Sequence, residues 1–201
     1  MEDMYKSEYP NIIEQNSETG VESIKSLLEY DYYENRTIWI NGSFEDPMQA
    51  IKIVIAMEYL DKNGDDDIIL KIFNYGGAVD CLWTIINAMN RCKCDIRTEI
   101  HGEASSVAGM IFINGTKGKR FMTPNSFLML HEMRWSNNEN TFSFNSNQHK
   151  NYYEVGHNNF AKFIADKMGK TLKETKNWLK KDNWMTPENA IKLGLCDHIL
   201  N

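Results

Sequence analysis

The chain has 201 residues, of which 42% are hydrophobic and 25% charged, enough to bury the core of one compact domain. Its 28 acidic and 22 basic residues give a net charge of −6, which argues against a general nucleic-acid-binding surface. No apolar run is long enough to cross a bilayer, the first ten residues are unlike a secretory signal, and the four cysteines form no metal-ligand pattern, so we expect a cytoplasmic protein without a metal site.

The first third of the chain predicts a polar arm followed by alternating helices and a strand. Residues 1–20 are polar and favour a flexible N-terminal arm, whereas 21–201 is expected to form a single domain. The apolar spacing in Val21–Tyr30 predicts a short amphipathic helix, Thr37–Ile40 a strand, and Pro47–Leu60 a helix that begins at a proline.

Two strand–turn–helix units follow. Ile68–Ile72 is a continuous apolar run that ends near Gly76-Gly77, and Val79–Met89 has helical spacing. Asp95–Ile100 alternates as a strand does, and it leads through a small-residue turn into the apolar run Val107–Ile113. This repetition predicts parallel strands with both turns at the same sheet edge, so the glycine pair and Ser106 should be neighbours.

Ser106 lies at the predicted start of a helix, where unpaired amides and the helix dipole can stabilise negative charge. This is a favourable position for a nucleophile. A serine there can equally be an ordinary helix N-cap, and Ser105 is a rival nucleophile.

His131 follows the strand-like segment Phe127–Leu130, where it could be a catalytic base or a hydrogen-bonded core histidine. Beyond it, Phe142 and Phe144 indicate a short exposed strand, and the residues from His149 to Met168 a long amphipathic helix.

Two helix-capping patterns lie in the last part of the chain. Thr171–Glu174 predicts the start of one helix and Thr186-Pro187-Glu188 the start of another that ends at Gly194. Asp182 lies between them and is the candidate third member of a Ser–His–Asp triad, with Asp166 and Asp197 as alternatives.

Several motifs in a fixed order resemble the proteolytic subunit of the Clp protease family from about Asn11 to the C-terminus. They are Gly102-Glu103-Ala104-Ser105-Ser106, Gly118-Lys119-Arg120-Phe121, Pro124-Asn125-Ser126 with His131, Glu188-Asn189-Ala190, and Gly194-Leu195-Cys196-Asp197. The resemblance implies an α/β, crotonase/ClpP-type fold of repeated ββα-like units, with residues 132–168 as a projecting handle of helix plus strand.

The resemblance also implies the roles of single residues. Ser106 matches the nucleophile of this serine peptidase family, His131 the general base, and Asp182 the acid that orients it. Gly77 and Val107 match the two positions whose backbone amides form the oxyanion hole. Such a site would cleave peptide bonds through an acyl-enzyme, with His131 accepting the proton of Ser106.

The same resemblance implies the assembly. It predicts a heptameric ring, commonly two stacked face to face, fed with polypeptide by a hexameric AAA+ ATPase at an axial pore lined by residues 1–20. The chain itself would bind no cofactor, because the partner ATPase uses the ATP, and it would bind neither nucleic acid nor membrane.

The chain also departs from the family pattern. Glu103, Ser105, Val107 and Ala108 differ from the usual residues around the nucleophile, Tyr75 replaces the proline before the glycine pair, and Lys180-Lys181 replaces an acidic–arginine pair. These changes motivate two alternatives: a catalytically weak or inactive paralogue with a structural role in the ring, and a phage-type peptidase that acts without the ATPase. An acyl-CoA enzyme of the same fold superfamily is disfavoured, because it would not need Ser106, His131 and Asp182 together.

Overall fold

The computed structural model describes residues 11–15, 22–134 and 147–200. Its strands are β1 (Asn11–Gln15), β2 (Glu22–Ser26), β3 (Thr37–Phe44), β4 (Ile68–Gly77), β5 (Ile96–Ser105), β6 (Arg120–Met122), β7 (Phe127–Leu130), β8 (Asn183–Met185) and β9 (His198–Ile199). Its helices are α1 (Leu27–Glu34), α2 (Pro47–Lys62), α3 (Val79–Met89), α4 (Val107–Ile113), α5 (Asn147–Met168), α6 (Leu172–Leu179) and α7 (Pro187–Lys192). None of the helices among these residues is long and apolar enough to span a bilayer.

A seven-stranded sheet forms the centre of the molecule, with β3, β4, β5, β6 and β9 in that order. Neighbours along this path are all parallel. Strand β5 pairs with β6 through its first half and with β7 through its last three residues, and β8 runs antiparallel to β7. The predicted parallel pairing of the two strand–turn–helix units is therefore confirmed.

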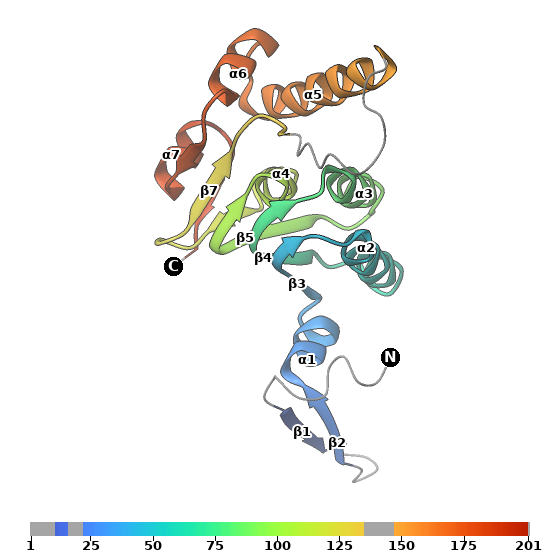
Figure 1. Cartoon of the computed structure of the whole chain (residues 1–201). Coiled ribbons are helices and arrows are strands. Elements are labelled where there is room, and N and C mark those ends of the chain that lie inside the picture. The colour runs from blue at the N-terminus through green and yellow to red at the C-terminus, as the bar shows by residue number, and fades with distance from the viewer. Residues whose placement is uncertain (1–10, 16–21, 135–146, 201) are drawn as a thin grey trace.

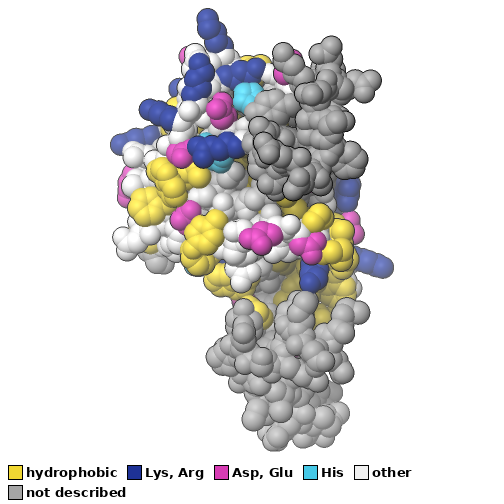
Figure 2. Space-filling view, in the orientation of Figure 1, with side chains coloured by type: hydrophobic (Ala, Val, Ile, Leu, Met, Phe, Trp, Pro, Cys, Tyr) yellow, Lys and Arg dark blue, Asp and Glu magenta, His cyan; other side chains and the backbone are white. Residues whose placement is uncertain are grey.

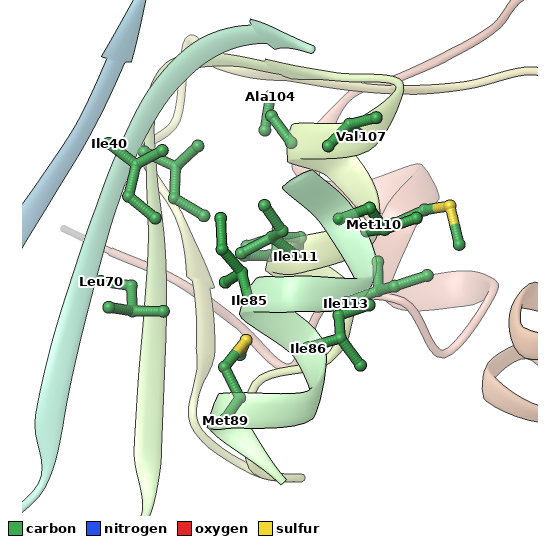
Figure 3. Close-up of a cluster of buried hydrophobic side chains, with 14 of the residues drawn as sticks. Ile40, Leu70, Ile85, Ile86, Met89, Ala104, Val107, Met110, Ile111 and Ile113 are labelled. Atoms are coloured by element: carbon green, nitrogen blue, oxygen red, sulfur yellow. The ribbon is translucent and has the colours of Figure 1, made fainter. Parts of the chain in front are cut away.

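Helices α2, α3 and α4 lie together beside strands β3, β4 and β5 (Figure 1). The apolar positions of α3 face inward, so Ile85, Ile86 and Met89 lie in the interior with Ile40 and Leu70 of the sheet (Figure 3). All seven residues of α4 are buried, as expected for a helix that is apolar on every side. Burial of each such large side chain contributes roughly 1.5–3 kcal/mol, so these helices fix the turns that precede them.

The long helix α5 and the shorter α6 lie at one end of the sheet, and β1, β2 and α1 project from the other (Figure 1). Thr171 caps α6 through its side chain, and the side chain of Glu174 bonds back to the Thr171 amide, as the capping pattern predicts. Basic side chains gather at the α6 end of the visible face (Figure 2). The lysines in and around α6 are Lys170, Lys173, Lys176, Lys180 and Lys181.

The N-terminal region differs from the pattern-based prediction. The segment Val21–Tyr30, predicted as one helix, divides into strand β2 and the beginning of α1, because Glu22–Ser26 pairs in antiparallel register with Asn11–Gln15. That pairing also gives regular structure to five residues of the expected arm. Backbone hydrogen bonds from a neighbouring strand here outweigh a weak helical pattern.

Most other predicted elements have the expected bounds, among them α3, α4 and β7. Strand β3 continues past the expected stop at Asn41-Gly42 to Phe44, and β4 includes the glycine pair. Strand β5 continues past Ile100 to Ser105, so most of the predicted small-residue turn is strand. The predicted strand at Phe142–Phe144 lies outside the described residues. The mixed α/β fold expected from the family resemblance is confirmed.

Candidate active site

Ser106 is the single residue between β5 and α4, and it has φ 56° and ψ −118°. A positive φ is uncommon for a residue with a side chain, and among the described residues other than glycine only Arg36 shares it. Although Ser106 has the N-cap position of α4, its side chain makes no capping hydrogen bond. The ordinary capping role considered from the sequence is therefore not what its hydroxyl performs.

Ser105 has a different environment. Its side chain is buried, and its hydroxyl donates a hydrogen bond of 2.5 Å to Oε1 of Glu103. Ser106 is only half-buried. Accessibility therefore favours Ser106 over Ser105 as the hydroxyl that a substrate can reach.

The glycine pair lies against this turn, as the sequence predicts. A Cβ atom on Gly76 would be 2.7 Å from the carbonyl oxygen of Ser105 and 2.8 Å from Cβ of Ser106. On Gly77, which has φ 137°, it would be 2.2 Å from the carbonyl oxygen of Phe44. Both positions therefore require glycine, because of close backbone approach and positive φ.

Asn74 is a residue of this turn that sequence reasoning missed. Its buried side chain accepts a hydrogen bond of 2.8 Å from the amide of Gly76 and donates one of 3.0 Å to the carbonyl of Asn41. The amide of Gly76 is thus already engaged, which leaves that of Gly77 as the candidate oxyanion donor. An Asn two residues before a glycine is the signal of an Asx turn that could have identified it.

Val107 is the first residue of α4, and its backbone amide therefore has no acceptor within the helix. The Cβ position on Gly76 would be 3.2 Å from this amide nitrogen, so the glycine turn and the helix start are in contact. The structure thus brings together the Gly77 and Val107 segments that the family resemblance assigns to one oxyanion hole.

His131 directly follows β7, which the sheet places beside the end of β5. Ser105 is paired in register with Met129, and the amide of Ser106 donates a hydrogen bond of 2.8 Å to the Met129 carbonyl. His131 is 9% exposed, and its Nδ1 atom has no hydrogen-bond partner among the described residues. Burial, reinforced by the positive charge of Arg134, lowers the pKa of this histidine below its usual 6.5, although Asp182 acts in the opposite direction.

Asp182 lies between α6 and β8, and the register of β8 places Asn183 opposite Leu130. Its backbone is therefore near His131, but its carboxylate Oδ1 accepts a hydrogen bond from a terminal guanidinium nitrogen of Arg134. The hydrogen bond that His131 Nδ1 would donate to the Asp182 carboxylate in a closed triad is not formed, so the structure brings the three predicted residues to one region without forming a closed triad.

Asn183 is a second residue that sequence reasoning missed. Its side-chain amide is within 3.1 Å of the carbonyl of Leu130, 2.8 Å of that of Trp178 and 2.7 Å of that of Lys181. These contacts tie the loop that carries Asp182 to the end of β7. No sequence pattern indicates this contact, because Leu130 is 53 residues away.

The other acids considered from the sequence lie elsewhere. Asp197 is bonded to Arg120 at 2.7 and 2.8 Å, in the region where β6 and β9 pair. Asp166 is exposed on α5. Of the three candidate acids, Asp182 is the one whose charge affects His131.

A cavity of about 560 Å³ opens beside the glycine turn and provides room for a ligand. Its walls come from the start of α3, the segment after His131, and α5. The lining residues are Gly77, Ala78, Val79, Asp80, Trp83, Met133, Arg134, Val155, Gly156 and Asn159. A ligand in this cavity would therefore contact both the glycine turn and Arg134.

Sequence comparison supports the resemblance. The profile of the Clp protease family matches residues 11–201. A protein from Streptococcus suis is 32% identical over 197 residues, covering 96% of each chain, and one from Streptococcus salivarius is 30% identical over 196 residues, covering 95% of this chain and 96% of that protein. Both are named ATP-dependent Clp protease proteolytic subunit.

Proposed function

The chain belongs to the Clp protease family, and on this basis we propose that it is a serine endopeptidase that uses Ser106, His131 and Asp182. The observation that carries the proposal is the backbone conformation of Ser106. A strained conformation at a strand-to-helix turn persists where surrounding structure imposes it, and such strain clusters at active sites.

In the first half of the reaction, Ser106 Oγ attacks the peptide carbonyl and His131 accepts the hydroxyl proton. The amides of Gly77 and Val107 donate hydrogen bonds to the oxyanion. His131 then passes the proton to the amine that leaves, and an acyl-enzyme on Ser106 remains.

In the second half, His131 takes a proton from water as the water attacks the acyl-enzyme, and returns a proton to Ser106 Oγ when the acid is released. Asp182 stabilises the protonated imidazole through Nδ1–H. For this the Asp182 carboxylate must turn from Arg134 to His131.

The proposed assembly is a heptameric ring, stacked in pairs, that a hexameric AAA+ ATPase supplies with unfolded polypeptide. The names of the two relatives, each a proteolytic subunit of an ATP-dependent protease, support the ATPase partner, and the family resemblance supports the ring. In this assembly residues 1–20 border the axial pore and α5 belongs to the handle that meets the opposite ring. The chain itself binds no cofactor, since the ATPase partner uses the ATP.

A structural, non-hydrolytic role in the ring is the second candidate. The bond between Arg134 and Asp182 favours it, because it leaves Nδ1 of His131 without an acceptor among the described residues.

A fluorophosphonate probe, which labels activated serines, separates the two candidates. We expect labelling of the wild-type protein at Ser106, no labelling or peptide cleavage in Ser106→Ala, and retained labelling in Ser105→Ala. Unlabelled wild-type protein in assembled rings, as shown by sedimentation, would instead favour the structural role. Casein degradation without an added ATPase would indicate a stand-alone peptidase.

A further inference from the structure

Arg134 occupies a position between three parts of the proposed site. It follows His131 by three residues, its guanidinium bonds Asp182, and it lines the cavity that begins at Gly77. The side chains of Arg134 and Asp182 are 64% and 41% exposed, so either can change partner without disturbing the core.

The unpaired Nδ1 of His131 could gain a partner in a second arrangement, in which the Asp182 carboxylate accepts its hydrogen bond. A buried polar atom without a partner is costly, whereas an exposed ion pair contributes little to stability. Turning the Asp182 carboxylate toward His131 would give Nδ1 a hydrogen-bond partner but would break the exposed ion pair with Arg134. The turn would also move a carboxylate that is 41% exposed toward a buried imidazole, which carries a desolvation cost. Because this cost opposes the gain at Nδ1, the two arrangements should be close in free energy, so that a small perturbation exchanges them.

We propose that Arg134 is a positioning residue that competes with His131 for Asp182, so that the peptidase rests with an open triad and closes it when a peptide in the cavity displaces Arg134. The inference rests on the proposed function, since it assigns Asp182 to the triad. Entry of a peptide supplies the displacement because Arg134 forms part of the cavity wall.

The charges around His131 agree with this competition. The positive charge of Arg134 opposes protonation of His131, and the negative charges of Asp182 and Glu132 favour it. Glu132 is itself near His157 of α5, with 3.6 Å between Oε2 and Nε2. Removal of Arg134 should therefore raise the pKa of His131 for two reasons: the positive charge of Arg134 is lost, and the Asp182 carboxylate is released from Arg134.

The test compares Arg134→Gln with Lys181→Gln, which removes the same charge from the exposed residue next to Asp182 in the chain. For Arg134→Gln we expect the rate of fluorophosphonate labelling at neutral pH to rise about threefold to fivefold, the effect that an exposed ion pair can exert. The acid limb of the pH–rate profile should move to higher pH. Lys181→Gln should change the rate less than twofold, and adding Asp182→Asn to Arg134→Gln should remove the gain.

A second measurement does not depend on catalysis. The pH dependence of His131 modification by diethyl pyrocarbonate, followed by mass spectrometry, should show a higher pKa in Arg134→Gln than in wild type. Equal labelling rates and equal His131 titrations in both proteins would overturn the inference. If no protein is labelled at Ser106 but the His131 titration shifts, the proposed hydrolysis fails while the competition for Asp182 stands.

Discussion

Replacing Ser106 with glycine should stabilise the protein while abolishing hydrolysis. The residue has φ 56° and ψ −118°, a combination that a Cβ atom makes unfavourable and glycine adopts freely. Ser106→Ala removes the same hydroxyl but keeps the Cβ. The difference in stability between the two variants therefore isolates the backbone strain from the loss of the nucleophile.

The expected magnitude follows from two opposing contributions. A side chain held in so sparsely populated a region costs about 1–3 kcal/mol. The greater conformational freedom of glycine in the unfolded chain reduces this gain in stability by about 0.5–1 kcal/mol. Ser106→Gly should thus be about 1 kcal/mol more stable than Ser106→Ala, which for a chain of this size is a rise in Tm of about 2–4 °C.

The assay is thermal unfolding of both variants at one protein concentration, since assembly makes Tm depend on concentration. Ser105 provides the matched control, because it is the last residue of β5, directly before Ser106, and has no positive φ. There glycine should be less stable than alanine. A Ser106→Gly variant that is no more stable than Ser106→Ala would refute the idea that the turn stores strain.

Three further predictions concern the surroundings of the site. Gly77→Ala should prevent soluble expression or lower Tm strongly, because its Cβ would lie 2.2 Å from a backbone oxygen, and a normal Tm would contradict this packing. Asp197→Ala should cost about 3–5 kcal/mol in urea unfolding, since it leaves a buried Arg120 unpaired. Although burial opposes the charge of Asp197, Arg120 holds the pKa of its carboxyl below 3.8. The stabilisation by the Arg120–Asp197 pair should therefore persist above pH 4 and fade as the pH falls through the folded-state pKa. An Asp197→Ala variant as stable as the wild type at neutral pH would contradict this prediction. Because burial lowers the pKa of His131 below 6.5, the kcat/KM of the wild type should decline on acidification only below pH 6.5. A pH profile of peptide cleavage measures this, and an acid limb with its midpoint above pH 6.5 would contradict the prediction.

The sequence by itself determined the repeated strand–turn–helix units. The bounds of α3 and α4 follow from apolar spacing and small-residue turns, and these are properties of a few consecutive residues. The same local signals placed Ser106 at a helix start and the glycine pair at the same sheet edge. The order of the motifs then indicated the family.

Tertiary structure alone decided which partners the polar groups have. Strand β2 exists because Asn11–Gln15 pairs with it, although its own pattern favoured a helix. The choice of Asp182 between Arg134 and His131 depends on a loop that Asn183 ties to β7 across 53 residues. Such a choice balances a weak exposed ion pair against a buried unpaired nitrogen, and neither quantity can be assigned before the chain has folded.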